Sequence, residues 1–305
     1  MKVLQTKAEG LRIPAVGLGC MRLMVLKDDK DIQNLIHSAL KQEINFFDHA
    51  DIYAGGMSEY VFGRNISGIN REDIIIQTKC SIKPGISYDF SKEYIINSVD
   101  GSLKRLGTDY VDILLLHRPD TLMEPEEVAE AFDELERTGK VRYFGVSNMN
   151  PGQIALLESE MPGRILFDQI QFSLAHCDII DAGLNVNIEN NAGIVRDGGL
   201  LEYARLKHIT LQAWSPFQFG MFEGTFIGSE KYPELNKTLE ELADKYGVTA
   251  SAIAVAWIMR HPAGIQTIVG TTKGSRLSEI AKAADFKLEH DEWYRLYLAA
   301  GKQLP

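Results

Sequence analysis

The sequence contains little cysteine, no excess of basic residues and no long apolar run. The three cysteines in 305 residues, Cys20, Cys80 and Cys177, are too few and too scattered for a disulfide framework or a zinc knuckle. Acidic residues outnumber basic ones by 42 to 32, giving a formal net charge of −10, whereas nucleic-acid-binding proteins usually carry a basic excess. No apolar run approaches the roughly 20 residues that cross a bilayer. These absences favour a reducing compartment and small-molecule chemistry.

The beginning of the chain also lacks the apolar stretch of a signal peptide. We therefore expect a cytoplasmic protein that interacts with neither nucleic acid nor membrane. No Pro/Gly/Ser-rich linker or charge block divides the chain, and α/β barrels commonly reach this length as one unit. We expect residues 1–305 to form a single domain that acts as a monomer.

Short, nearly continuous apolar runs alternate with amphipathic segments. Such runs are typical of parallel strands buried on both faces, and they cover residues 16–19, 45–48, 74–79, 111–117, 142–147, 165–171, 210–214 and 266–269. Helical periodicity follows in residues 31–41, 91–106 and 125–137, where Ser91 is a suitable N-cap and Gly107 and Gly139 are helix stops. Eight strands with interleaved helices leave two architectures open, a closed barrel or a doubly wound sheet.

Two other segments lie outside the eight apolar runs and the helical segments. Residues 3–6 and 11–13 flank Glu9 and Gly10, which predicts a β-hairpin that plugs the barrel floor. Residues 175–198 are rich in asparagine and glycine and predict a long loop, which is uncommon unless it is functional.

Polar residues follow the apolar runs where the predicted strands end. Asp48, Lys79, His117 and Asn148 end four consecutive runs, and Tyr53 lies five residues past Asp48. In a parallel barrel these ends share one rim, where active sites are built. A Lys79 ammonium paired with Asp48 would favour the ionised form of a nearby tyrosine and lower its pKa from the usual value of about 10.

Such a tyrosine can protonate the oxygen of a carbonyl that is being reduced, while a histidine supplies a second hydrogen bond. Taken singly, Asp48 or Lys79 is as well explained by a solvated loop residue or a structural ion pair, and His117 by an ordinary rim histidine. Their shared rim position favours the catalytic interpretation.

Two other site hypotheses fit the sequence poorly. Residues 17–22 begin like a dinucleotide-binding fingerprint, but Arg22 stands where the third glycine must allow close packing of helix and strand. His49 and Asp51 could be drawn as metal ligands, yet no further ligand run at supporting spacing accompanies them.

With these spacings of Asp48, Tyr53, Lys79 and His117, the chain resembles the aldo-keto reductases. Further motifs of the family are similar to residues 17–21 (Gly-Leu-Gly-Cys-Met), 47–53 (Phe-Asp-His-Ala-Asp-Ile-Tyr) and 141–148 (Val-Arg-Tyr-Phe-Gly-Val-Ser-Asn). Residues 178–199 and 213–216 are similar to the bacterial YdhF-like branch of oxidoreductases. The resemblance implies a (β/α)₈ TIM barrel that holds NADP(H) without a Rossmann fold.

The resemblance also implies residue roles. Tyr53 would be the general acid, Lys79 and Asp48 would tune it, and His117 would orient the carbonyl. Trp214 would stack on the nicotinamide, although an aromatic residue there could equally be core. The cofactor-binding set implied by the family comprises Cys20, Met21, Asp48, Ser147, Asn148, Gln169, Trp214, Ser215, Pro216, Gly270, Thr271, Thr272, Arg276 and Glu279.

Residues 270–279 follow the last predicted strand and open a helix, whose N-terminal N–H groups are suited to phosphate. The planar guanidinium of Arg276 suits the same ligand, although an exposed cap with a solvated arginine explains it too. Two positions depart from the resemblance, because Gly270 stands where many members carry a phosphate-binding lysine and Ile280 where many carry asparagine.

The sequence therefore predicts an enzyme that reduces a small-molecule aldehyde or ketone to an alcohol with NADPH. One alternative is a non-catalytic NADP-binding barrel that acts as a sensor or scaffold and would resemble the potassium-channel β subunits. Another is an unrelated barrel enzyme such as an aldolase, in which Lys79 would form a Schiff base.

Overall fold

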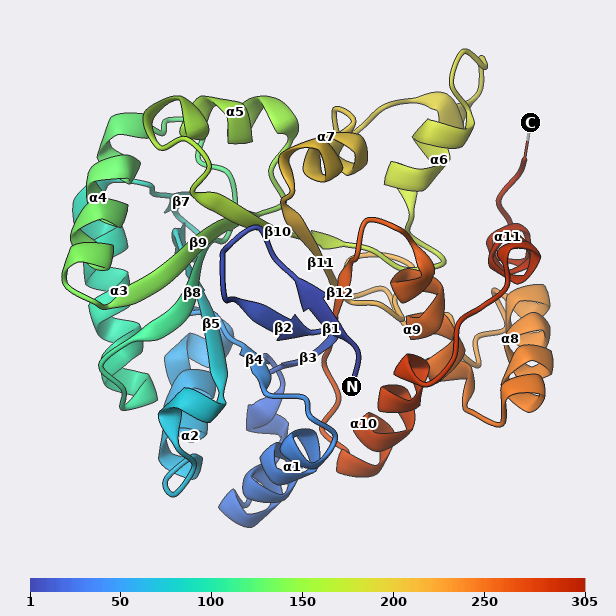
Figure 1. Ribbon diagram of the computed structural model, residues 1–305, viewed down its shortest axis with the longest axis horizontal. Coiled ribbons are helices and arrows are strands. Elements are labelled where there is room, and N and C mark those ends of the chain that lie inside the picture. Colours follow the sequence, from blue (N-terminus) through green and yellow to red (C-terminus); the bar gives the residue numbers. More distant parts are fainter. Residues whose placement is uncertain (305) are drawn as a thin grey trace.

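Eight parallel strands close into a barrel in the computed structural model, which describes residues 1–304 (Figure 1). Around the ring the order is β10-β11-β12-β3-β4-β5-β8-β9, and every pair of neighbours is parallel. The strands are β3 (Val16–Gly19), β4 (Phe46–Asp48), β5 (Ile75–Cys80), β8 (Val111–Leu116), β9 (Val141–Ser147), β10 (Ile165–Gln171), β11 (Thr210–Trp214) and β12 (Gln266–Val269). The structure confirms the predicted (β/α)₈ barrel and excludes the doubly wound sheet.

A hairpin covers the amino-terminal end of the barrel, as the sequence predicts. Strand β1 (Val3–Gln5) pairs antiparallel with β2 (Arg12–Pro14), and Figure 1 shows this hairpin across the barrel opening. Its side chains alternate, so that Leu4 and Ile13 are buried while Val3 is 46% exposed. A second, smaller hairpin, β6 (Ile82–Lys83) and β7 (Ser87–Tyr88), follows β5.

Helices surround the barrel (Figure 1). They are α1 (Asp29–Lys41), α2 (Met57–Asn65), α3 (Lys92–Leu106), α4 (Pro125–Arg137), α5 (Pro151–Glu160), α6 (Asp178–Leu184), α7 (Leu200–Lys207), α8 (Pro233–Tyr246), α9 (Ala250–Arg260), α10 (Gly274–Ala281) and α11 (His290–Ala299). Short 3₁₀ helices cover Leu23–Val25, Tyr53–Gly56, Arg71–Asp73, Asn191–Gly193 and Lys282–Ala284. None of the helices described in residues 1–304 has both the length and the apolar character that crossing a bilayer requires.

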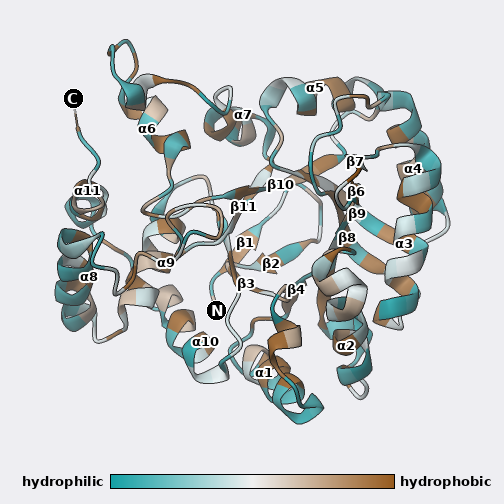
Figure 2. Ribbon diagram, turned by 180° about the vertical axis from the view of Figure 1, so that it is seen from behind, coloured by the Kyte–Doolittle hydropathy of each residue, from teal (hydrophilic) through white to brown (hydrophobic). Residues whose placement is uncertain are grey.

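Helix α4 shows how sequence produces this outer ring. Pro125 occupies its first turn with two acidic residues, a favourable N-terminus because proline pre-sets φ and carboxylates complement the helix dipole. Its apolar residues form one buried stripe, in which Phe132 stacks on Phe144 of β9 with ring centroids 4.0 Å apart. Figure 2 shows the same division in α3 and α8, whose hydrophilic residues lie on the side away from the barrel.

The prediction of a long loop over residues 175–198 is wrong in part. The segment contains α6 and the short 3₁₀ helix Asn191–Gly193. Asparagine side chains tie the remaining turns, since Asn185 Nδ2 donates to the Asp181 carbonyl (2.9 Å) and Asn190 Nδ2 donates to Asn185 Oδ1 (2.9 Å). A helix of seven residues gives too short a periodic pattern to be recognised in an asparagine-rich sequence.

Gly63 in α2 sits where a larger residue has no room. A Cβ atom there would lie 2.3 Å from the carbonyl oxygen of Leu106 and 2.8 Å from that of Arg105, at the end of α3. Because these obstacles are backbone atoms, helix α2 would have to move away from α3.

We expect Gly63→Ala to lower the free energy of unfolding by about 1–3 kcal/mol, as overpacking usually does. The matched control is Gly183→Ala in α6, where the new Cβ would have an ordinary contact 3.7 Å from Glu202 Oε1. Urea unfolding of both variants measures the difference. A Gly63→Ala variant as stable as the control would contradict the proposed close approach.

Candidate active site

The predicted rim residues converge at the carboxyl ends of the strands. Asp48 is the last residue of β4, Lys79 lies near the end of β5, and His117 directly follows β8. Lys79 Nζ lies 2.7 Å from Asp48 Oδ1 and 3.2 Å from the Tyr53 hydroxyl. The Tyr53 and His117 rings meet edge to face, with centroids 5.9 Å apart. The structure thus brings the four predicted catalytic residues into one cluster, the tetrad of Asp48, Tyr53, Lys79 and His117.

The Lys79 ammonium is almost completely buried and fully hydrogen-bonded. Its three N–H groups face four acceptors and must share them: both carboxylate oxygens of Asp48 at 2.7 and 2.8 Å, the His49 carbonyl at 2.7 Å and the Tyr53 hydroxyl at 3.2 Å. Burial is the largest influence and lowers the pKa of Lys79, but Asp48 and Tyr53 together outweigh it and the pKa is raised overall. Lys79 therefore remains a cation beneath the tyrosine.

Tyr53 is held by an unusual turn. Its backbone N–H donates to the Ala50 carbonyl (3.1 Å), and the next two residues, Ala54 and Gly55, both have left-handed φ angles of 50° and 63°. Alanine rarely adopts this conformation, so the turn carries local strain at the site. The turn lowers the phenol toward Lys79, whose Nζ lies 5.0 Å from the ring centroid.

The prediction that Lys79 lowers the pKa of Tyr53 below its usual value is wrong in its net direction. Burial is the largest influence on its pKa and raises it, Lys79 lowers it, and the net direction is upward. The sequence pattern indicates the nearby cation but does not show the desolvation of Tyr53, which disfavours its phenolate form. Tyr53 is therefore a protonated donor throughout the neutral range, and Lys79 limits the cost of its ionisation rather than making it acidic.

His117 presents a neutral imidazole to the same space. Its backbone N–H donates to the Cys80 carbonyl (2.8 Å) and to Ser81 Oγ (3.1 Å), which fixes the start of the loop. Nδ1 is buried and has no hydrogen-bond partner among residues 1–304. Burial first, and the Lys79 charge second, hold the pKa of His117 well below its ordinary value of 6.5. A neutral ring can donate one hydrogen bond to a substrate oxygen without transferring charge.

A buried glutamine network lies beneath Asp48, and Gln169 is its only member predicted as a site residue from the sequence. Gln77 and Gln169 donate from Nε2 to Asp48 Oδ1, at 2.6 and 3.0 Å, and both also reach Gln212 Oε1, at 3.0 and 3.1 Å. Gln212 Nε2 continues to Gln266 Oε1 (2.8 Å). All four are at most 2% exposed. The feature of the sequence that indicates this network is one glutamine in each of four apolar strands. A packed barrel would normally have aliphatic residues at these positions.

The residues predicted to hold the nicotinamide form a second chain of hydrogen bonds at the rim. Trp214 Nε1 donates to Asn148 Oδ1 (3.2 Å), Asn148 Nδ2 donates to Ser147 Oγ (2.8 Å), and Ser147 Oγ donates to the Gln169 carbonyl (2.7 Å). These contacts hold the half-buried indole in place beside the tetrad. Gln169 Nε2 donates to Asp48 and Gln212 in the barrel interior. Its hydrogen bonds are therefore made within the protein.

The predicted phosphate end lies between β12 and α10. Thr271 and Thr272 are half-buried, whereas Arg276 and Glu279 are exposed and have no ion-pair partner in the described chain. A Cβ atom on Gly270 would lie 3.9 Å from Arg22 Nη2. Arg22 therefore places a cation beside Gly270, the position at which many aldo-keto reductases carry a phosphate-binding lysine.

The remaining predicted cofactor residues directly follow strands β3 and β11. Pro216 is buried, and Ser215 has a left-handed φ of 51° directly after Trp214. Met21 is 39% exposed, but Cys20 is fully buried and its thiol faces the Leu18 carbonyl at 3.6 Å. Three features together fit a nicotinamide dinucleotide: the hydrogen-bonded indole of Trp214, the helix N-terminus of α10, and Arg22 and Arg276, which have no ion-pair partner in the described part of the chain. Among residues 1–304 no group of three or more His, Cys, Asp or Glu side chains is placed to hold a metal ion.

Residues 15–297 match the sequence model of the aldo/keto reductase family, and the chain belongs to this family. It is 37% identical to the uncharacterized oxidoreductase YcsN of Bacillus subtilis, over 98% of both chains. It is 35% identical to the 6-dehydroglucose reductase of Agrobacterium fabrum, over 91% of this chain and 92% of the relative. Identity to the oxidoreductase YdhF of Escherichia coli is 31%, over 89% and 88% of the two chains, which confirms the predicted likeness to that branch.

Solved structures support the same assignment. The thermostable aldo-keto reductase Tm1743, in complex with epalrestat, matches with a TM-score of 0.81 and 29% identity over 98% of this chain and all of that one. The Bombyx mori aldo-keto reductase in complex with NADP matches with a TM-score of 0.76 over this whole chain and 94% of that one, and at 22% identity it bears on the fold alone. The protein is thus an NAD(P)-dependent oxidoreductase of the aldo-keto reductase family.

Asp168, next to Gln169 on β10, is a buried carboxyl group outside the tetrad. It is fully buried, and neither oxygen has a hydrogen-bond partner in residues 1–304. Burial raises its pKa from 3.8 to about 8, and the N–H groups of Met149 and Asn148, which lie near the carboxyl group without forming a hydrogen bond, oppose the rise only in part. Because the raised pKa belongs to the folded state, ionisation costs stability increasingly between pH 4 and 8, and the cost is complete above pH 8.

We expect Asp168→Asn to remove this cost and to stabilise the protein more at pH 8 than at pH 5. The difference between the two gains should be at least about 1.4 kcal/mol, the equivalent of one pKa unit. Urea unfolding at both pH values measures it, with Asp109→Asn, an exposed carboxylate, as the control. Equal gains at pH 5 and pH 8 would show that Asp168 does not titrate with a raised pKa.

Proposed function

We propose that this chain, acting as one barrel domain over residues 1–305, reduces an aldehyde or ketone to an alcohol with NADPH. Tyr53 serves as the general acid, Lys79 and Asp48 support it, and His117 orients the carbonyl. The observation that carries the proposal is the Lys79 ammonium, hydrogen-bonded at once to the Tyr53 hydroxyl (3.2 Å) and to both oxygens of Asp48.

The proposed proton transfer follows from these contacts. A nicotinamide bound beside Trp214 would supply the hydride for the carbonyl carbon. Tyr53 and His117 would donate hydrogen bonds to the carbonyl oxygen, where negative charge develops. Tyr53 gives its proton to that oxygen, which completes the alcohol. The phenolate that remains faces the Lys79 ammonium, so the charge is stabilised where it forms. Asp48 keeps the ammonium in place, and Gln77 keeps Asp48 in place.

The preference for NADPH is proposed on electrostatic grounds. The 2′-phosphate that distinguishes NADPH from NADH needs a cation free to donate, and Arg276 on the first turns of α10 has no carboxylate within 4 Å in residues 1–304. Its guanidinium suits two phosphate oxygens at once. Arg22 beside Gly270 supplies a second cation on the same rim.

We expect Tyr53→Phe to lower kcat by about 10²–10⁴-fold, the usual contribution of a general acid. Among residues 1–304, the Tyr53 hydroxyl is the only proton-donating side chain within hydrogen-bond distance of Lys79 Nζ. Steady-state reduction of a carbonyl panel with NADPH tests it. The panel should include 6-dehydroglucose, the compound named for relatives at 35% and 33% identity. Tyr60→Phe, which alters an exposed tyrosine on α2, is the control.

Full turnover by Tyr53→Phe would refute the acid role. NADPH binding by the parent protein without turnover of any carbonyl would instead favour a sensor or scaffold. Trapping of Lys79 by borohydride together with a carbonyl substrate would indicate the Schiff-base alternative.

We expect Arg276→Gln to raise the Kd for NADPH by about tenfold or more and to change the Kd for NADH little, because a lost charge-assisted hydrogen bond costs about 1.5–3 kcal/mol. Arg22→Gln should also weaken NADPH binding. Fluorescence titration with each cofactor measures both effects, and Arg137→Gln, an exposed arginine on α4, is the control. Equal losses for NADPH and NADH in Arg276→Gln would contradict recognition of the 2′-phosphate.

A further inference from the structure

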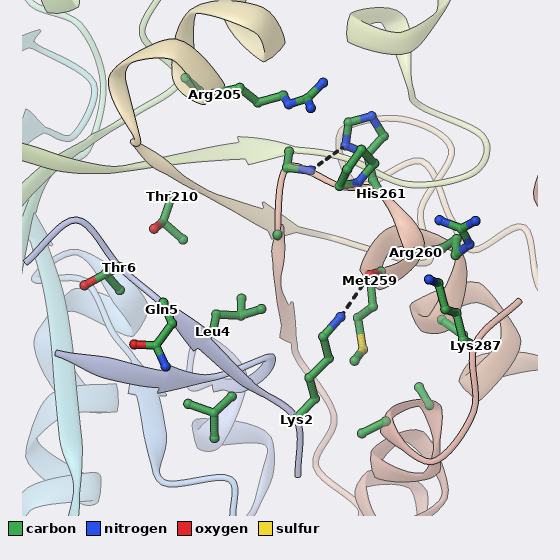
Figure 3. A pocket seen from close by; sticks show the side chains of 18 of the residues that line it. Lys2, Leu4, Gln5, Thr6, Arg205, Thr210, Met259, Arg260, His261 and Lys287 are labelled. Carbon is green, nitrogen blue, oxygen red and sulfur yellow. Dashed lines mark hydrogen bonds between the residues drawn. The ribbon is translucent and has the colours of Figure 1, made fainter. Parts of the chain in front are cut away.

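A groove of about 1190 Å³ lies at the end of the barrel opposite the proposed active site. Its walls come from strand β1, from the ends of helices α7 and α9, and from residues 283–287 (Figure 3). Thr210, the first residue of β11, and Gly264, which precedes β12, also line it. These are the starting ends of strands whose other ends form the rim that carries Trp214 and Gly270. The groove is therefore separate from the tetrad and the cofactor rim.

The groove concentrates positive charge in a protein of net charge −10. One carboxylate, Asp285, lines it, against five cations, Lys2, Lys7, Arg205, Arg260 and Lys287. In the chain up to residue 304, none of the five has a carboxylate within 4 Å. Such a surplus repels itself and attracts anions.

Backbone contacts draw three of these cations together. Lys2 Nζ donates to the Met259 carbonyl (3.4 Å), which places it beside Arg260. Arg260 Nε in turn donates to the Leu288 carbonyl (2.8 Å), which places its guanidinium beside Lys287. Figure 3 shows the Arg260 and Lys287 side chains on the same side of the groove. The Nε contact fixes the guanidinium and leaves its two Nη groups without an acceptor among the described residues.

A second donor group faces the groove from α7 and α9. His261 Nδ1 accepts a hydrogen bond from the Ala263 N–H (3.2 Å), so the proton of a neutral ring lies on Nε2. Burial and the nearby Arg205 charge lower the pKa of His261 to about 4. Figure 3 shows the Arg205 side chain extending toward this ring. At neutral pH the pair thus offers a guanidinium and an uncharged N–H donor.

The dipoles of two helices balance part of the positive charge of the groove, but most of that charge has no counter-charge. Helices α7 and α9 both end at this groove, with Arg205 and Arg260 in their last turns. Each C-terminus carries about half a negative charge, so the two account for about one of the cations. The floor is apolar, with buried Leu4, Ile209 and Met259, and offers no further counter-charge.

We propose that this groove binds a small molecule that carries two or more phosphate groups. Guanidinium groups match phosphate oxygens in a bidentate manner. Arg205 and Arg260 line the groove from α7 and α9, and Lys287 lies on the same side as Arg260. The volume exceeds what a single phosphate fills and suits a ligand whose body rests on the apolar floor. A long nucleic acid is disfavoured, because the rest of a chain of net charge −10 repels it.

Inorganic tripolyphosphate is the probe, added to the full-length protein. Calorimetry measures affinity, and NMR of the imidazole rings reports location, because His208 and His261 line the groove and the chain has only seven histidines. Arg205→Gln with Lys287→Gln removes two groove cations. Lys104→Gln with Lys237→Gln removes the same charge from exposed sites on α3 and α8, where neither lysine has an ion-pair partner among residues 1–304. Arg276→Gln removes a cation of the proposed cofactor site.

Saturable binding that shifts the His208 and His261 signals is the expected result, and the groove variant should weaken it at least tenfold. The Lys104/Lys237 control and Arg276→Gln should bind as the parent protein does. Equal weakening in the Lys104/Lys237 control would show a general charge effect and overturn the proposal. Binding that leaves both histidine signals unmoved, or that is lost in Arg276→Gln, would overturn it as well. Circular dichroism checks that the groove variant is folded, and Lys287→Gln alone provides a milder test.

Discussion

The structure depends on one buried ion pair, between Lys79 and Asp48, at the top of the barrel interior. Removing two charges from water is costly, and the pair is stable only when its remaining hydrogen-bonding capacity is used. The Lys79 ammonium meets this condition through Asp48, the His49 carbonyl and Tyr53, and Asp48 meets it through Gln77 and Gln169. These partners come from β4, β5 and β10 and from the turn after β4, so the pair is satisfied only once the ring of strands has closed.

The same pair decides what Tyr53 can do. Tyr53 is only half-buried, but desolvation of its phenol still raises its pKa even though an ammonium lies 3.2 Å from its oxygen. Without that ammonium, loss of the proton would leave an unpaired buried anion. Lys79 therefore matters most at the moment of proton transfer, when the charge on the tyrosine oxygen appears. His117 complements it, because burial and Lys79 keep the imidazole neutral and hydrogen bonding is the role left to it.

The sequence predicts the repeating elements well and the long-range polar contacts poorly. The apolar runs at 16–19, 165–171, 210–214 and 266–269 coincide with β3, β10, β11 and β12, because buried parallel strands need continuous apolar residues. The gathering of Asp48, Lys79 and His117 follows from strand order alone. The side-chain contacts of Gln212, the raised pKa of Tyr53 and the position of Arg22 beside Gly270 depend on burial and on distant segments, which local patterns do not report. Helix α6 was missed because seven residues give little periodicity.

The coupling between Lys79 and Tyr53 can be measured directly by ¹³C NMR of protein labelled at the tyrosine Cζ atoms. The Tyr53 signal is assigned as the one absent from Tyr53→Phe, and its titration is followed in the parent protein and in Lys79→Met. Because the ammonium lowers the pKa of Tyr53 against the effect of burial, its removal should raise that pKa further. An unchanged or lowered Tyr53 pKa in Lys79→Met would contradict the account.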